Sequence, residues 1–487
     1  MAWVLVDCLK RAFSGFHMST VPAASTHQLI PSDIAIGPTL PPGPANSKLV
    51  QTYRYATNPL ALLDECARKF GDIFTIRLMG SRPWVMLSSP ALVKAMFTAP
   101  PDAMHAGEAN FSVFGPIAGH ASVFTMDERS HLERRQMMLP QFHGDRMRVY
   151  FEQIRQITSD AIDGWRLDRE FSIHREMQAI TLQVIIRAVF GIIPEDQNED
   201  DRELVEALTD LANKAVGSSL LLAPPLQRDF GPWSPWGRVV RIIRRADEAI
   251  LAAIRRRRAD ADTGQRHDIL SLLLQSAAED DSRLTDREVR DELVVMLMAG
   301  HETTGTALAW AFERLLSLPH VEERLRTELS FVAGRKPIES EHLARLEYLD
   351  AFVKESLRAR PIMPAAGARV VMRPFEIGGY AIPAGVILAN AVYLLHRRSD
   401  IYPDPAAFRP DRFLGKRVID PYAWTPFGGG MRRCLGMHFA LFEMKTVLTT
   451  VLWRARLRAR TPHTRAVPRG FFLIPERGLP VTLTERN

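Results

Sequence analysis

The sequence predicts a mainly α-helical protein with a small β portion, folded as a single large domain. Helical periodicity runs through most of the 487 residues, whereas strand-like alternation is confined to short stretches. The longest helical pattern covers residues 285–317 and would span about 48 Å, enough to cross a whole domain. No Gly/Ser linker divides the chain, and neither strand–helix alternation nor a glycine-rich nucleotide-binding motif occurs.

The composition is that of an ordinary globular protein, with 46% hydrophobic and 24% charged residues. The net charge of +6 is dispersed, and the densest basic run, 255–258, ends a predicted helix, where cations offset the helix dipole. No nucleic-acid-binding motif accompanies it, so we expect no nucleic-acid partner. Three cysteines (Cys8, Cys66 and Cys434) are too few for a disulfide framework and predict a reducing compartment, the cytoplasm.

Residues 1–37 are predicted to form a loosely ordered N-terminal extension, and residues 38–487 the folded domain. The first 16 residues are apolar in parts but carry Asp7, Lys10 and Arg11, so they are too short and too charged to span a bilayer. We therefore expect no transmembrane span. An interfacial amphipathic helix remains an alternative for this segment, as does translation from Met18 in place of Met1.

The first elements after the extension follow from local signals. Prolines make residues 40–44 stiff, and an amphipathic helix is predicted for 59–70. Alternating segments at 73–79 and 84–87 around a Gly-Ser pair predict a β-hairpin. Residues 101–124, with glycine, asparagine, proline and scattered phenylalanines, are predicted to be irregular.

The middle of the chain is predicted to be helical. Helices should fill most of 127–258, interrupted by a loop at 217–236 that is rich in Leu, Pro and Trp. The longest helix should begin at a capping box formed by Thr285 and Glu288 and end at Ser317, before a proline. This helix would form the centre of the domain.

The last third of the chain mixes both element types. Helices are predicted for 321–332, 346–360 and 438–454, short strands for 368–388, an irregular stretch for 398–433 and a terminal hairpin for 471–483. Strands therefore form only a small part of the predicted fold.

The most informative segment is the loop 427–436, which contains Cys434 between Arg432 and Gly436 and leads directly into a helix. The helix N-terminus and a nearby guanidinium favour a thiolate over a thiol, and a thiolate is the form that ligates a metal. Glycines let the backbone approach a flat cofactor and hydrogen-bond to sulfur. The alternative interpretation is a glycine-rich turn with a buried structural cysteine.

The pattern F-x-x-G-x-R-x-C-x-G in this loop resembles the haem-ligand loop of the cytochrome P-450 family, the haem-thiolate monooxygenases. The resemblance covers roughly residues 38–485 and is closest to bacterial and cyanobacterial members. It implies the P-450 fold, a helix-rich triangular prism with a long central helix, and haem b held by the Cys434 thiolate. Phe427, Arg432 and Gly436 would then contact the cofactor.

Glu355 and Arg358 lie three residues apart on one predicted helical face, and Arg412 follows in the segment Phe408-Arg-Pro-Asp-Arg-Phe413. Alone, such a pair is most often a surface ion pair. Their order and spacing resemble the E-x-x-R and P-x-R-F elements of the same family. The resemblance implies a buried Glu–Arg–Arg network that holds the loop behind the haem.

The segment Ala299-Gly-His-Glu-Thr-Thr304 lies within the long helix, where glycine and threonine are poor helix formers and a local opening is expected. It resembles the acid–alcohol segment of the family, which implies that Glu302 and Thr303 deliver protons during oxygen activation. His301 should face away from this pair. The alternative is a polar kink without a catalytic role.

Four further residues are implied by the resemblance to hold the haem propionates. His131 and Arg135 form an H-x-x-x-R pair on one helical face, although many family members have Trp at the position of His131. Arg432 is a third partner, and Arg369 a fourth on looser spacing. Guanidinium groups suit carboxylates because they donate two parallel hydrogen bonds. The alternative for Arg135 is a surface ion pair.

The resemblance implies an enzyme that inserts one atom of O2 into an apolar substrate of the fatty acid, alkane, terpenoid or polyketide class. No redox domain is fused, so a ferredoxin or flavodoxin and its reductase are the expected electron donors, meeting basic residues near the thiolate. A peroxide-using peroxygenase or isomerase and a non-enzymatic haem sensor are the alternatives. We expect loop 217–236 to gate a pocket lined by seven apolar residues, namely Phe111, Phe114, Met296, Ala299, Ile362, Met363 and Phe472.

Overall fold

The central helix α12 (Asp286–Ser317) organises this computed structural model, and it begins at the predicted capping box. The structure describes residues 40–487 except 143–145, 194–196, 217, 223–226, 232, 261–265, 267, 280–283, 335, 416–418 and 462, so the predicted extension 1–37 lies outside the described residues. Thr285 Oγ1 accepts a hydrogen bond of 3.2 Å from the Glu288 amide, and the Glu288 carboxylate accepts one of 2.9 Å from the Thr285 amide. The predicted opening in this helix is not seen, because it is a continuous α-helix over its whole length.

Helix α8 (Ile173–Phe190) packs directly on α12, and two glycines allow the close approach. A Cβ atom at Gly300 would lie 2.8 Å from Cδ1 of Ile185, and one at Gly305 would lie 3.1 Å from Cα of Gln178. A side chain at Gly305 would press on the backbone of α8, and one at Gly300 would require the Ile185 side chain to move. Gly300 therefore serves the contact with α8, while the helix stays regular.

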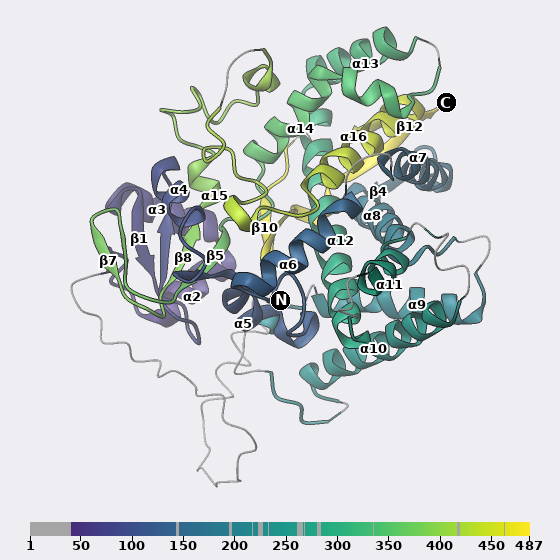
Figure 1. Ribbon diagram of the computed structural model, residues 1–487. Coiled ribbons are helices and arrows are strands. Elements are labelled where there is room, and N and C mark those ends of the chain that lie inside the picture. Colours follow the sequence, from purple (N-terminus) through teal and green to yellow (C-terminus); the bar gives the residue numbers. More distant parts are fainter. Residues whose placement is uncertain are drawn as a thin grey trace.

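The other helices surround α12 or flank the sheet, as Figure 1 shows, and four of them, α3, α13, α14 and α16, have the predicted positions to within two residues. Helices of the described chain are α2 (Lys48–Thr57), α3 (Pro59–Phe70), α4 (Pro90–Phe97), α5 (Ala106–Ala118), α6 (Glu128–Met138), α7 (Arg146–Gly164), α9 (Glu199–Asp210), α10 (Pro235–Ala259), α11 (Ile269–Glu279), α13 (Pro319–Ala333), α14 (Glu347–Ala359), α15 (Val392–Leu395) and α16 (Met437–Arg454).

Strands of the described chain form four small sheets, and the largest lies beside α2, α3 and α4 at one end of the molecule (Figure 1). Its order is β1 (Ile73–Ile76), β2 (Trp84–Leu87), β8 (Ile387–Asn390), β5 (Ala366–Val371) and β3 (Met104–His105), with β2 and β8 parallel. The predicted hairpin of β1 and β2 is confirmed, with Ile73 opposite Leu87. The others pair β6 (Phe375–Ile377) with β7 (Tyr380–Ile382), β10 (Ala466–Arg469) with β11 (Phe472–Pro475), and β12 (Pro480–Arg486) with β4 (Glu170–Ser172) and β9 (Ala455–Ala459).

Two predictions of secondary structure were wrong, and both depended on distant residues. Residues 101–124 contain helix α5, whose first amides at Gly107 and Glu108 donate to the Asp127 carboxylate at 2.8 and 2.9 Å. The capping residue lies 20 positions beyond Gly107 in the sequence, so the local sequence around α5 did not predict it. The predicted terminal hairpin over 471–483 does not form, because β11 pairs with the earlier strand β10 and β12 joins a different sheet.

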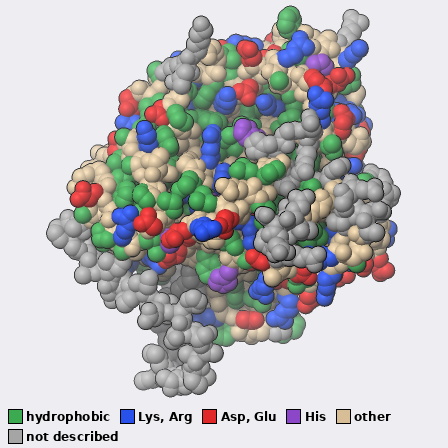
Figure 2. Space-filling model, in the orientation of Figure 1, with side chains coloured by type: hydrophobic (Ala, Val, Ile, Leu, Met, Phe, Trp, Pro, Cys, Tyr) green, Lys and Arg blue, Asp and Glu red, His purple; other side chains and the backbone are tan. Residues whose placement is uncertain are grey.

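The core and the surface agree with the composition. One large cluster of buried apolar side chains surrounds α12 and includes residues from α7, α8, α10, α14 and α16. Figure 2 shows acidic and basic side chains interspersed over the face in view, as the dispersed charge of the sequence predicts. None of the helices in the described part of the chain combines the length and the apolar composition that a membrane span requires.

Candidate active site

The cysteine loop runs from Phe427 through a short 3-10 turn at Gly430–Arg432 into α16, and the Cys434 amide closes it with a hydrogen bond of 2.9 Å to the Phe427 carbonyl. Gly428 and Gly430 adopt positive φ angles of 68° and 62°, which favour glycine. A Cβ atom at Gly430 would collide with the carbonyl oxygen of Phe97. The loop therefore has the tight glycine-dependent course that the sequence predicts, and it is pressed against the end of α4.

The Cys434 side chain is accessible although it lies among protein groups that disfavour a charge. Burial raises the pKa of the Cys434 thiol, while the backbone amide of Gly436 and the charges of Arg135 and Arg433 oppose the rise. A Cβ atom at Gly436 would meet open space. In contrast, Cys66 is buried on α3, and burial raises the pKa of its thiol to about 11. Of the two described cysteines, Cys434 alone is exposed and so accessible to a cofactor.

One face of α12 also borders accessible space in the middle of an otherwise buried helix. Ala299 is exposed and Thr303 is partly exposed, one turn apart, whereas Leu293 to Met298 and Thr304 to Phe312 are buried. The Thr303 hydroxyl donates a hydrogen bond of 2.5 Å to the Ala299 carbonyl. A hydroxyl held in this way keeps its oxygen available as an acceptor toward the accessible side.

Glu302, the neighbour of Thr303, points to a different side of the helix. Its Oε2 accepts a hydrogen bond of 2.6 Å from Nε2 of Gln178 on α8, and Oε1 is buried without a partner among the described residues. Burial raises the pKa of Glu302, and Arg469 and Gln178 partly oppose this. The structure thus does not join the predicted acid and alcohol by a direct hydrogen bond. The His301 side chain is buried and lines the same groove as Gln178 of α8, so it lies away from Thr303 but on the same side of the helix as Glu302.

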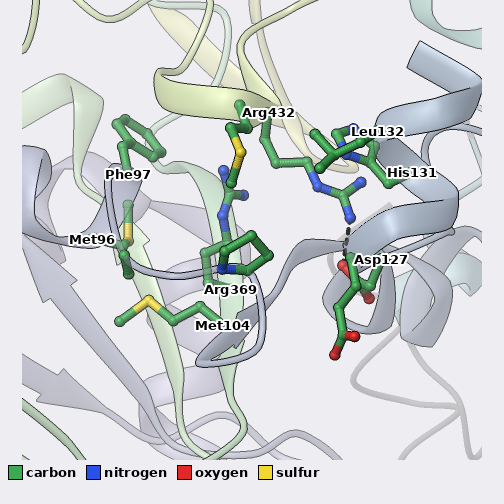
Figure 3. A pocket seen from close by; sticks show the side chains of 12 residues that line it. Met96, Phe97, Met104, Asp127, His131, Leu132, Arg369 and Arg432 are labelled. Carbon is green, nitrogen blue, oxygen red and sulfur yellow. Dashed lines mark hydrogen bonds and ion pairs between the residues drawn. The ribbon is translucent and has the colours of Figure 1, made fainter. Parts of the chain in front are cut away.

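A cluster of cationic side chains lies beside the cysteine loop, in the pocket drawn in Figure 3. His131, Arg369 and Arg432 line this pocket, and burial together with the charges of Arg432, Arg135 and Arg369 lowers the pKa of His131 to about 3. Figure 3 shows Arg369 between Phe97 and Arg432. The structure therefore brings together four residues that the sequence predicts, from α6, β5 and the cysteine loop.

Arg369 has the most unusual surroundings in this cluster. It is 6% exposed, and among the described residues it donates only to the carbonyls of Gly367 and Ala368, at 3.3 and 3.2 Å. Burial and the charge of Arg432 lower the pKa of Arg369 to about 9. Burying a guanidinium without a carboxylate is costly, so the site calls for an anionic ligand. The two carboxylates of a haem fit this requirement.

Asp127 and Phe97 belong to the site but were not predicted. Asp127 accepts a hydrogen bond of 2.5 Å from Arg432, in addition to capping α5. The sequence feature that could have indicated Asp127 is its position at the N-cap of α6, four residues before His131. The ring of Phe97 lies 5.4 Å from the Arg369 guanidinium, a cation–π contact that no motif announces.

The buried network of Glu355, Arg358 and Arg412 has the arrangement that the sequence predicts. Arg358 donates to both oxygens of Glu355, at 2.6 and 2.7 Å, and neither side chain is exposed. Arg412 approaches the same carboxylate at 3.4 Å, and the Arg409 amide donates to it at 2.8 Å. Both arginines also donate to carbonyls of the irregular stretch before the cysteine loop, at Pro403, Asp404, Pro405 and Ala407. The network thus pins that stretch to α14.

Most of the predicted pocket residues keep some accessible surface. Ala299 is exposed and Met296 is buried, whereas the rest are half-buried, namely Phe111, Phe114, Ile362, Met363 and Phe472. Phe114 lies 5.1 Å from Phe471 and 5.6 Å from Phe124, so the hairpin of β10 and β11 meets α5 through Phe471. The seven-residue lining stays a prediction.

Other predicted surfaces lie partly outside the described residues. Loop 217–236 is described only in part, and there Phe230 and Trp233 are 79% and 91% exposed. Of five basic residues expected on the thiolate side, the side chain of Arg146 and all of Lys416 and Arg417 lie outside the described residues, while Arg148 and Arg433 are exposed.

Comparisons with known proteins agree with this geometry. The family model described as Cytochrome P-450 matches residues 38–479. Proteins named cytochrome P-450 135B1 and cytochrome P-450 137, both from Mycobacterium tuberculosis, are 38% and 36% identical over 90% and 84% of this chain, covering 90% and 83% of their own lengths. The solved structure of cyanobacterial CYP120A1 with retinoic acid bound is similar, with a TM-score of 0.80 and 23% sequence identity. The match covers 92% of this chain and 99% of that structure's chain. The cytochrome P-450DA haem domain gives the same score at 24% identity, covering 92% and 98%. The chain therefore belongs to the cytochrome P-450 family and is a haem-thiolate monooxygenase, whose cofactor is iron protoporphyrin IX with a cysteine as axial ligand.

Proposed function

We propose that Cys434 is the axial ligand, and that the chain inserts one oxygen atom from O2 into an apolar substrate with electrons from separate redox proteins. The observation that carries this proposal is the accessible Cys434 thiol and the buried cluster of His131, Arg369 and Arg432 beside its loop. The described carboxylates near this cluster do not balance its positive charge. A flat cofactor with a metal at its centre and two carboxylates at its edge matches both halves of this arrangement.

The described residues fit haem at three points. The Cys434 thiolate would take a bond to iron, and the Gly436 amide together with Arg135 and Arg433 would stabilise its negative charge. His131, Arg135, Arg369 and Arg432 would hold the propionates. Phe427, half-buried and packed against the core, would support the loop that carries Cys434. Bound haem supplies the iron centre on which dioxygen is activated.

Proton delivery is assigned to Thr303 and Glu302. Thr303 lies on the accessible face of α12, where its hydroxyl can hold a water molecule next to the reacting oxygen. Glu302 is protonated more readily than an exposed glutamate, because burial raises the pKa of its carboxyl. A carboxylic acid of this kind can pass a proton to that water and recover it from solvent. The separation of the two side chains requires that Glu302 act through water or through rotation away from Gln178.

The substrate side of the proposal rests on apolar side chains. Ala299 on α12, Phe114 on α5 and Ile362 after α14 retain accessible surface and carry no charge. Such a lining suits fatty acids, alkanes, terpenoids or polyketides, whose burial contributes about 25 cal/mol per Å². A ferredoxin or flavodoxin with its reductase is the proposed electron source, and exposed Arg148 and Arg433 are candidates to meet an acidic donor. A cytoplasmic location stays a prediction from the cysteine content.

The test is the absorption spectrum of the ferrous–CO complex of the purified holoenzyme, with NADH consumption and product formation in the presence of surrogate redox proteins. The parent should give the band typical of a thiolate ligand, and Cys434→His should lose it. Cys66→Ser should keep the band, which controls for a general effect of removing a thiol. A thiolate-type band in Cys434→His would contradict the assignment of the ligand. A normal band without substrate-dependent product would contradict the proposed reaction alone.

A further inference from the structure

A groove of about 1050 Å³ lies on the α8 side of the central helix, away from the face that carries Ala299 and Thr303. Its walls come from α8, α9, β4, the hairpin of β10 and β11, and the turn at Glu476–Gly478. His174, Gln178 and His301 form part of the lining, all buried. Because His301 and Ala299 point to different sides of α12, this groove is separate from the proposed haem side.

Arg469, the last residue of β10, supplies an unpaired positive charge to the groove. It is half-buried, and its side chain has neither a hydrogen bond nor an ion pair among the described residues. Its charge helps to lower the pKa of His174 and of His301 to about 4 in each case, although burial is the larger cause. Arg469 and both imidazoles line the same groove, to which His301 is contributed by α12.

His301 adds an unpartnered polar atom to the lining of this groove. The side chain is 1% exposed, and its Nε2 has no hydrogen-bond partner among the described residues. His174, in contrast, uses Nε2 in a contact of 3.1 Å with the Thr306 hydroxyl. In the neutral tautomer that carries its proton on Nε2, this imidazole is a hydrogen-bond donor, and leaving such a donor buried and unpaired costs free energy. Arg469 and His301 thus offer two donors for one acceptor-rich group.

No carboxylate of the groove lining is free to take this role. Glu170, the one acidic residue among the lining side chains, already approaches Arg460 at 3.4 Å. Arg175 and Arg477 are exposed at the groove and have no side-chain partner in the described chain. Three guanidinium groups therefore face a space with one paired carboxylate, and the groove attracts anions.

The remaining wall of the groove is apolar. Leu182 and Ile186 lie one turn apart on α8, and Val205 faces them from α9. Phe171, Ile474 and Pro475 continue this surface. A ligand that satisfies both ends has an anionic head group and an apolar body.

We propose that this groove binds an amphipathic carboxylate of the fatty acid class, with its carboxylate at Arg469 and His301 and its chain along Leu182, Ile186 and Val205. The site is distinct from the one in which the enzyme oxidises its substrate, so the proposal stands or falls independently of the proposed reaction. The bound carboxylate would offset the charge of Arg469, which lowers the pKa of Glu302 as well.

The experiment uses the holoenzyme saturated with an azole that ligates the iron, so that the haem side is occupied and its absorbance reports any displacement. Binding of radiolabelled dodecanoate is then measured by equilibrium dialysis. We expect one further equivalent to bind without a change in the haem spectrum, and methyl dodecanoate to compete weakly because it lacks the charge. Arg469→Gln should weaken binding about tenfold or more, as the loss of a charge-assisted hydrogen bond predicts.

The matched control is Arg465→Gln, which removes an exposed arginine just before β10 that does not line the groove. It should bind dodecanoate as the parent does, and Arg469→Lys should retain most of the affinity. The proposal is wrong if the azole-bound holoenzyme shows no saturable binding. It is equally wrong if folded Arg469→Gln, with an unchanged haem spectrum, binds as tightly as the parent.

Discussion

Gln178 and Glu302 are joined across the interface of α8 and α12 by a hydrogen bond of 2.6 Å from the amide nitrogen to Oε2. This bond holds Glu302 on the side of the helix away from Ala299. Of the acid and the alcohol, only Thr303 therefore lies on the accessible face. Acid and alcohol are adjacent in sequence but occupy different surroundings. Their roles can therefore be separated by mutation.

Thr303→Ala should retain haem and substrate binding but uncouple turnover, with NADH oxidised and peroxide released in place of product. The product rate should fall roughly 10²-fold, the order usual for a positioned proton donor. Thr303→Ser keeps the hydroxyl and is the matched control. Glu302→Gln should slow the same step, and unchanged coupling in Thr303→Ala would exclude the relay.

Arg369→Met should act in opposite directions on the two forms of the protein. In the haem-free protein it removes a buried guanidinium without a carboxylate partner, so the melting temperature should rise or stay the same. In the holoenzyme it removes a propionate partner, so haem should transfer to apomyoglobin about tenfold faster. Arg373→Met, at an exposed arginine paired with Asp102, should change neither quantity. Parallel destabilisation of both forms would argue against a ligand-binding role.

Arg358→Met should destabilise the fold by about 3–5 kcal/mol, because it leaves the Glu355 carboxylate buried with weaker partners. The free energy of unfolding from denaturant titration of the haem-free protein measures this change. Arg409→Met is the control, since its ion pair with Asp404 is more than half exposed and should contribute at most about 1 kcal/mol. Equal effects of the two substitutions would show that the network is not a structural clamp.

Glu292 should make stability depend on pH. Its carboxylate lies within α12, accepts 2.7 Å and 3.2 Å hydrogen bonds from the Val123 amide and Arg134, and burial raises its pKa to about 7. From pH 4.5 to 7 the unfolded chain ionises this group while the native state keeps the proton, so the unfolding free energy falls as pH rises and then levels off.

Glu292→Gln should remove this contribution, which is at most about 3 kcal/mol across the window. The measurement is the difference in unfolding free energy between parent and variant at several pH values. Glu133→Gln, at an exposed glutamate of α6, should leave the parent's slope unchanged. A slope that survives in Glu292→Gln would assign the titration to another group.

Local signals were sufficient for the elements whose determinants lie within a few residues. The capping box of Thr285 and Glu288 placed the start of α12, and the spacing of Glu355 and Arg358 on one helix turn predicted their contact. The glycines and Arg432 around Cys434 predicted the shape of its loop, because turns depend on few neighbours.

The features that were missed depend on residues far apart in sequence. The cap of α5 comes from Asp127, and the contact of Phe114 with Phe471 joins segments more than 350 positions apart. The side on which Glu302 points is decided by Gln178 on another helix. Tertiary packing determines such caps, contacts and side-chain orientations. It overrides local conformational preference and cannot be read from the periodicity of the sequence.

Phe97 connects three glycines that are otherwise unrelated in sequence. A Cβ atom at Gly367 would lie 2.8 Å from its ring and one at Gly429 would lie 2.5 Å from it, while Gly430 presses on its carbonyl oxygen. The same ring contacts Arg369. During evolution, therefore, the cysteine loop and the end of α4 constrain one another, since a larger residue at Gly429 would be accepted only together with a smaller one in place of Phe97. At Gly367 of β5 the φ of 67° favours glycine in any case. Related sequences should record the constraint as correlated substitution at the positions of Phe97 and Gly429.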